Sequence, residues 1–219
     1  MSAVSLAPIG IFGGTFDPIH FGHLRPALEL REHLALSEVR FIPASVPPHR
    51  GEPSASPLQR LAMLRLALQG VEGMSVDERE LLRQGPSYMA DTLRSLRHEA
   101  GERPLVLLLG LDAFLGLASW HEWHSIIGLA HIAVARRPGW DSTGLQGNAA
   151  LEQLWREHAC DDVSQLHHSP AGRIVMVDVT PLAISATAIR AQLWQGGSPR
   201  FLLPDCVLDY LERNKLYTG

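Results

Sequence analysis

Cysteine is scarce in this chain of 219 residues, which contains only Cys160 and Cys206. The two residues form no CxxC motif, so the sequence indicates neither a disulfide framework nor a dithiol redox site. Two reduced thiols in a cytosolic protein are the simpler interpretation.

Long apolar runs are also missing. The longest, Leu105–Leu111, is far shorter than the roughly 20 residues that a membrane-spanning helix needs. The N-terminus has no basic region and no cleavage site of the kind that marks a secretory signal. We therefore expect a cytoplasmic protein that does not bind membranes.

An excess of positive charge is absent as well, since the formal net charge is −4. This balance argues against nucleic acid as a partner. The hydrophobic share of 46% and the charged share of 19% are typical of a soluble globular protein. No repeat or linker divides the sequence, so we predict a single domain over residues 1–219, as a monomer or homodimer.

Short apolar runs alternate with helical patterns along the whole chain. Several runs are continuous, as in strands that are buried on both faces. This alternation predicts an α/β fold, a Rossmann-like, doubly wound, mostly parallel sheet with helices on both faces. The predicted strands are Pro8–Phe12, Val39–Pro43, Met74–Val76, Leu105–Leu109, His131–Ala135 and Ile174–Asp178.

Leucine stripes indicate which helix faces turn inward. One predicted stripe comprises Leu58, Leu61, Leu64 and Leu68, and the tail Pro204–Tyr217 reads as a last helix with its leucines facing the core. Ligands of such folds bind at the carboxyl ends of the strands, near the point where strand order reverses.

The densest group of chemistry-bearing residues lies within Gly10–His23 (GIFGGTFDPIHFGH). An apolar run ends at Gly13 and Gly14, and His20 and His23 stand three residues apart where a helical pattern begins. Small glycines, a helix N-terminus and two imidazoles together suit a polyphosphate. The two histidines could instead ligate zinc with further residues, or be hydrogen-bonded structural side chains.

A second candidate anion site is Ile184–Arg190 (ISATAIR). Ser185 stands as a helix N-cap, Thr187 follows in the first turn, and Arg190 lies one turn further. A capped helix start with a guanidinium can hold phosphate, although most such serines are only caps.

Other segments at predicted strand or helix ends carry weaker signals. Asp112 follows the strand that ends at Gly110, where a carboxylate can bind ribose hydroxyls or cap the next helix. Trp120 could stack on an aromatic ring or pack in the core. The start of a helix in GPSYMADTL offers free N–H groups, and Arg137 ends a strand. The long segments Ala44–Pro57 and Pro138–Asn148 could act as lids or be ordinary surface loops.

These segments resemble a known superfamily. GGTFDPIHFGH is similar to the GGxFxPxHxGH signature of the nucleotidylyltransferases, and ISATAIR is similar to their ISxTxxR motif. Within the superfamily, the full set of segments most resembles the bacterial nicotinate-nucleotide adenylyltransferases. That family transfers an adenylyl group from ATP to nicotinate mononucleotide and releases deamido-NAD and pyrophosphate, a step of NAD biosynthesis.

The resemblance implies a role for each motif. The catalytic residues would be His20, His23 and Arg190. The ATP and phosphate contacts would come from Gly13, Gly14, Thr15, Phe16, Arg50, Gly110, Asp112, Arg137, Ser185 and Thr187. The nicotinate mononucleotide would be bound by Ser87, Tyr88, Met89, Thr92 and Trp120. Mg²⁺ is expected on the phosphates of ATP, with no protein ligand set of its own.

Two positions depart from the family pattern. Arg50 stands where members often have lysine, which keeps the charge but changes the geometry. Met89 stands where many have threonine, which removes a hydroxyl from the expected substrate contacts. A sibling transferase that acts on another phosphate, and a nucleotide sensor without activity, are the alternatives.

Overall fold

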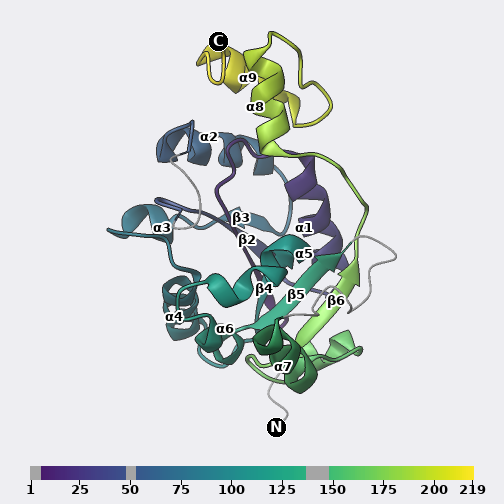
Figure 1. Cartoon of the computed structure of the whole chain (residues 1–219). Coiled ribbons are helices and arrows are strands. Elements are labelled where there is room, and N and C mark those ends of the chain that lie inside the picture. Colours follow the sequence, from purple (N-terminus) through teal and green to yellow (C-terminus); the bar gives the residue numbers. More distant parts are fainter. Residues whose placement is uncertain (1–5, 48–52, 137–147) are drawn as a thin grey trace. The chain divides into compact units, whose positions relative to one another are not determined.

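The computed structural model describes residues 6–47, 53–136 and 148–219 (Figure 1). In chain order the elements are β1 (Ile9–Gly14), α1 (Phe21–His33), β2 (Glu38–Pro43), α2 (Pro57–Leu68), β3 (Met74–Val76), α3 (Arg79–Leu82), α4 (Met89–Ala100), β4 (Leu105–Gly110), α5 (Leu111–Leu115), η1 (Leu117–Ser119), α6 (Trp123–Leu129), β5 (His131–Arg136), α7 (Ala149–His158), η3 (Val163–His167), β6 (Ile174–Asp178), α8 (Ala186–Trp194) and α9 (Asp205–Arg213). Among the described helices, none combines the length and the apolar character needed to cross a membrane.

The strands form one sheet in the order β3-β2-β1-β4-β5-β6. The pairs β1–β4, β4–β5 and β5–β6 are parallel. The chain adds β2 and β3 on one side of β1 and the remaining strands on the other, so strand order reverses beside β1. The predicted α/β Rossmann-like fold is confirmed.

All six predicted strands are present, with ends that differ by at most two residues. The side chains from Leu105 to Leu109 are almost completely buried, which explains why their sequence is continuously apolar. The reversal of strand order places the carboxyl end of β1, Gly13-Gly14, where such folds bind ligands.

The described residues fall into two compact units. Unit 1 contains residues 6–12, 27–40, 88–136 and 148–181, and unit 2 contains residues 13–26, 41–47, 53–87 and 182–219. The strands β1 and β2 run from one unit into the other. A single domain over residues 1–219 stays a prediction.

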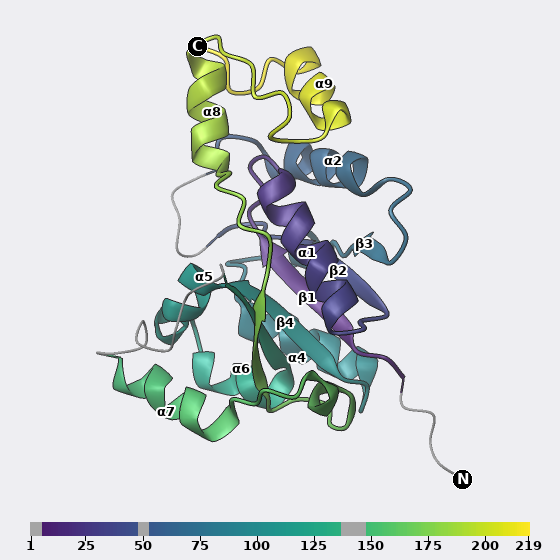
Figure 2. The same cartoon turned by 90° about the vertical axis from the view of Figure 1, so that its right-hand side faces the viewer.

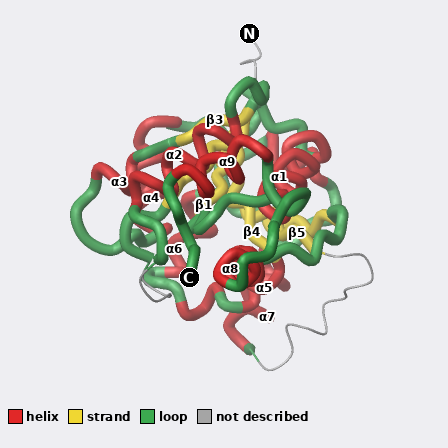
Figure 3. The backbone as a smooth tube through the Cα atoms, turned by 90° about the horizontal axis from the view of Figure 1, so that it is seen from above, coloured by secondary structure: helices red, strands yellow, loops and turns green. Residues whose placement is uncertain are grey.

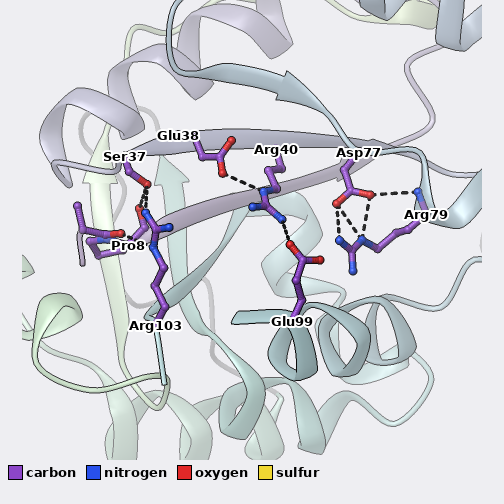
Figure 4. A network of polar contacts seen from close by, with 9 residues as sticks. Pro8, Ser37, Glu38, Arg40, Asp77, Arg79, Glu99 and Arg103 are labelled. Atoms are coloured by element: carbon purple, nitrogen blue, oxygen red, sulfur yellow. Dashed lines mark hydrogen bonds and ion pairs between the residues drawn. The ribbon is translucent and has the colours of Figure 1, made fainter. Parts of the chain in front are cut away.

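Unit 1 is built on β4, β5 and β6, and its helices α4 and α6 lie side by side (Figures 1 and 2). Arginines fasten its edges. Arg103 donates to the carbonyl oxygen of Ala7 and to the hydroxyl of Ser37, and Arg40 pairs with Glu38 and Glu99 (Figure 4). Arg40 and Arg103 thus stabilise the fold of unit 1.

Unit 2 contains the packed pair α2 and α9, which lie side by side (Figures 2 and 3). Leu208 and Leu211 of α9 are buried, as predicted. The helix ends at Arg213, before Tyr217, and Leu216 beyond it is only half-buried. The prediction for Leu58 is wrong, because its side chain is 74% exposed. Leu58 lies in the first turn of α2, which is held by a Ser56–Gln59 capping box, and the buried stripe begins only at Leu61.

Candidate active site

The loop after β1 is folded tightly in unit 2. Phe16 has φ 51° and is 1% exposed, and its ring packs against Phe41 and against His23. A Cβ on Gly14 would stand 2.8 Å from that ring, so this position needs glycine. Because its side chain is in the core, a contact between Phe16 and phosphate could come only from its backbone.

The two histidines of the motif flank the start of α1. Their rings are stacked with centroids 3.7 Å apart, and the carbonyl oxygen of His20 accepts the backbone N–H groups of His23 and Leu24. His20 is 3% exposed, and burial lowers its pKa to about 4. His20 is therefore neutral at pH 7, which settles a charge state that the sequence had left open.

Gly22 brings the two sequence motifs together. A Cβ on Gly22 would lie 2.9 Å from the carbonyl oxygen of Ile184 and 2.9 Å from Nδ1 of His20. The segment before α8 therefore packs directly on the first turn of α1. Since both segments belong to unit 2, the structure joins residues that are more than 150 positions apart in the sequence.

The second motif is ordered as its pattern predicts. Ser185 caps α8 by accepting a hydrogen bond from the backbone N–H of Ala188 at 3.2 Å. Arg190 donates from Nη1 to the backbone oxygen of Asp17 at 2.7 Å, and its Nη2 lies 3.5 Å from Oγ1 of Thr187. The guanidinium thus lies beside the loop that leads into α1 and its two histidines.

Sequence reasoning missed three residues of unit 2. Asp17 is 5% exposed, and its carboxylate accepts hydrogen bonds from the backbone N–H groups of Ser54 and Ala55 and from the hydroxyl of Tyr217. Asp17 stands inside the first motif, which was the available signal. Tyr217 lies 200 positions away and gave no signal.

Arg60 is the third missed residue. It is fully buried, and its guanidinium donates to the backbone oxygens of Thr15, Ser45 and Ala55 at 2.8, 3.2 and 3.3 Å. In the sequence it looks like a solvated position between leucines. The structure shows that it joins the loop after β1, the loop after β2 and the segment before α2.

The residues predicted near ribose and pyridine lie mostly in unit 1. Asp112 is exposed in the first turn of α5, whose N-cap is Gly110, so Asp112 is not the cap that the alternative reading proposed. Trp120 is half-buried and follows η1. Tyr88 precedes α4, and its ring stacks on His121 with centroids 4.2 Å apart.

The neighbours of Tyr88 differ in what they can offer. Met89 is half-buried at the first position of α4. Thr92 is fully buried, and its hydroxyl donates to the backbone oxygen of Tyr88 at 3.2 Å, so it holds the turn together. Ser87 belongs to unit 2, where its hydroxyl accepts the backbone N–H of Ser45 at 2.9 Å.

Arg50 and Arg137 lie outside the described residues, as does most of the segment Pro138–Asn148. Their predicted contacts with phosphate stay predictions, and so do the binding roles of the residues located above.

Comparison with known proteins agrees with this geometry. A family model described as cytidylyltransferase-like matches residues 11–192. A probable nicotinate-nucleotide adenylyltransferase of Methylococcus capsulatus is 50% identical over 210 residues, which cover 95% of this chain and 99% of that protein. One from Dechloromonas aromatica is 51% identical over 213 residues, covering 96% of this chain and 97% of the relative.

The chain belongs to the nicotinate-nucleotide adenylyltransferase family. The predicted enzyme class, a nucleotidyltransferase of NAD biosynthesis, is confirmed. The solved Plasmodium falciparum nicotinic acid mononucleotide adenylyltransferase, complexed with NaAD, superposes with a TM-score of 0.72. It covers 96% of this chain, and this chain covers 97% of it. At 14% identity this likeness supports the fold alone.

Proposed function

We propose that the chain transfers the adenylyl group of ATP to the 5′-phosphate of nicotinate mononucleotide. An oxygen of that phosphate forms a bond to the α-phosphorus of ATP, and the bond from the α-phosphorus to the bridging oxygen breaks. The products are deamido-NAD and pyrophosphate. Since the nucleophile is already an anion, no residue has to remove a proton and no covalent enzyme intermediate is needed.

One observation supports this proposal above all. In unit 2 the start of α1, the start of α8, His20 and Arg190 converge on one loop. Helix N-termini and a guanidinium offset the repulsion between two phosphate groups and stabilise the charge that moves to the leaving pyrophosphate.

His20 contributes to this site as a neutral imidazole. A buried cation would need a compensating charge, whereas a neutral ring can donate one hydrogen bond to a phosphate oxygen. Arg190 supplies the permanent positive charge, with Thr187 near its outer nitrogen. We assign to His23 the same donor role as to His20.

Recognition of the pyridine nucleotide is assigned to unit 1. The backbone N–H groups at the start of α4, after Tyr88, would receive the nicotinate carboxylate. The indole of Trp120 would stack on the pyridine ring. Asp112, also in unit 1, would bind a ribose hydroxyl on the ATP side. Thr92 would act indirectly, through the turn that it fastens.

Mg²⁺ would enter with ATP. The described residues contain no group of three histidine, cysteine or acidic side chains that could hold a metal. In unit 2 the carboxylate of Asp17 already accepts three hydrogen bonds. These side chains suit an ion that is coordinated by phosphate oxygens and water. Such an ion would neutralise charge on the triphosphate.

The test is an incubation of the purified chain with ATP and Mg²⁺ plus one acceptor at a time, followed by measurement of pyrophosphate. The acceptors are nicotinate mononucleotide, nicotinamide mononucleotide and phosphopantetheine. We expect the acid to give the highest kcat/KM. Equal efficiency with the amide would contradict the role given to the N–H groups of α4. A preference for phosphopantetheine would favour the sibling transferase, and no pyrophosphate at all would favour the sensor.

A further inference from the structure

The C-terminus of the chain reaches the predicted catalytic arginine through Asp17. The hydroxyl of Tyr217 donates to Oδ1 of Asp17 at 2.6 Å. On its other side Asp17 faces Arg190, whose Nη1 lies 2.7 Å from the backbone oxygen of Asp17 and 3.7 Å from Oδ2. All three residues belong to unit 2.

The carboxylate of Asp17 is held from several directions. The backbone N–H of Ser54 donates to Oδ2 at 2.9 Å, and that of Ala55 donates to Oδ1 at 3.1 Å. With Tyr217 and Arg190 these contacts occupy a side chain that is almost wholly buried. A buried carboxylate that is held by several hydrogen bonds has a single conformation. It therefore also restricts the position of the groups that it contacts.

The contact with Asp17 orients Arg190. A guanidinium is planar, so fixing Nη1 on Asp17 also limits where Nη2 points. Nη2 lies on the side of Thr187, whose side chain is exposed at the start of α8. The Nη1 edge of the guanidinium thus binds Asp17. The Nη2 edge lies on the side of the first turn of α8, where the helix presents its N–H groups.

Tyr217 is built to be the donor in this network. Burial, and after it the hydrogen bond to Asp17, raise the pKa of its phenol well above its usual value. The phenol therefore keeps its proton at every physiological pH. The segment that carries it follows α9, which packs on α2, and ends at Gly219 against the end of α8 near Trp194.

Arg60 completes the surroundings of the carboxylate. Burial lowers the pKa of Arg60, and the negative charge of Asp17 acts in the opposite direction. Arg60 and Asp17 both bind the Ala55 backbone, one through its oxygen and the other through its N–H. The histidine loop and the C-terminal tail therefore share one polar network.

We propose that Asp17 and Tyr217 are positioning residues for the adenylyl transfer, which act through Arg190. The hydroxyl of Tyr217 fixes the Asp17 carboxylate, and Asp17 sets the guanidinium of Arg190 in the orientation that meets the triphosphate. This inference rests on the proposed function.

The experiment is a double-mutant cycle of Y217F with R190A, measured with ATP, Mg²⁺ and nicotinate mononucleotide. In the wild-type background we expect Y217F to lower kcat about tenfold, the size of a lost hydrogen bond to a charged group. In the R190A background it should change kcat by less than about twofold, because the group through which it acts is gone.

Tyr210 provides the matched control. It lies on α9 in the same C-terminal region, and the described part of the chain gives its hydroxyl no hydrogen bond to Asp17. Y210F should leave kcat within about twofold of wild type. All assays are run well below the melting temperature of each variant, so that unfolding does not enter the rate.

The outcomes separate the two proposals. If the wild type makes no pyrophosphate, the proposed function fails. If the wild type is active but Y217F lowers kcat by the same factor in both backgrounds, or has no effect in either, the positioning role is wrong. A loss of melting temperature without a change in kcat would also overturn it, because the contact would then serve stability only.

Discussion

Two buried histidines, one in each unit, show how differently the same side chain is used. In unit 1, His131 is fully buried, and both ring nitrogens are satisfied: Nε2 bonds the backbone oxygen of Ser169, and Nδ1 accepts the backbone N–H of Arg173. In unit 2, Nδ1 of His20 is buried without a hydrogen-bond partner among the described residues.

The difference teaches which histidine is structural. Burial lowers the pKa of both, so both are neutral at pH 7. Both ring nitrogens of His131 bond the backbone of its own unit. Nδ1 of His20 has no such partner among the described residues, and His20 immediately precedes the start of α1. An incompletely satisfied buried group is costly and therefore marks a site with another purpose.

The arginines repeat this contrast. In unit 1, Arg97 donates to the backbone oxygens of Leu129 and Pro170, and Arg103 fastens the N-terminal segment. In unit 2, Arg60 and Arg190 both donate to backbone oxygens of the motif loop. These two cations of unit 2 thus lie at the loop where a triphosphate is proposed to bind.

The largest effect is expected for His23. H23A should lower kcat by about 10²–10³, the usual result of losing one transition-state donor. The rate of pyrophosphate release measures kcat. The control is H98A, a substitution at an exposed position of α4, which should keep the wild-type activity. A loss below about threefold would place His23 with the structural histidines.

A smaller effect concerns pH and stability. The pKa of His20 is about 4 in the folded chain, against 6.5 for an imidazole exposed to water, so the unfolded chain binds more protons between these pH values. Stability should therefore fall as the pH is lowered from about 6.5 to about 4, by about 3 kcal/mol from His20 alone. Urea unfolding across this range measures it.

The variant H20Q isolates that contribution. It has no titrating group at position 20, so its unfolding free energy should depend less steeply on pH than that of the wild type. The remaining dependence includes His131, whose pKa is also lowered by burial. Equal pH dependence of the two proteins would mean that His20 is not neutralised by burial.

The smallest effect tests whether Trp120 of unit 1 recognises the pyridine ring. W120A should raise KM for nicotinate mononucleotide about tenfold, in line with the loss of one stacking contact, and leave KM for ATP within about twofold. Initial rates with either substrate varied provide both values. An equal rise in both constants would contradict the assignment of ring recognition to Trp120.

The sequence could predict the fold because its signals are local. The predicted strands Met74–Val76 and Ile174–Asp178 match β3 and β6 residue for residue. Ser185 is the helix N-cap that the sequence predicts. The prediction for Leu58 failed because a stripe of leucines does not reveal that the first turn of the helix stays exposed.

The sequence by itself determined the α/β alternation and the family, and it indicated the two motifs that are predicted to bind phosphate, because strand burial, helix capping and spacing within a motif act over short distances. Only the tertiary structure decided that His20 is neutral, that Arg60 is buried and that Tyr217 touches Asp17. Each depends on the desolvation or contact of groups that lie far apart along the chain, and no local pattern encodes that.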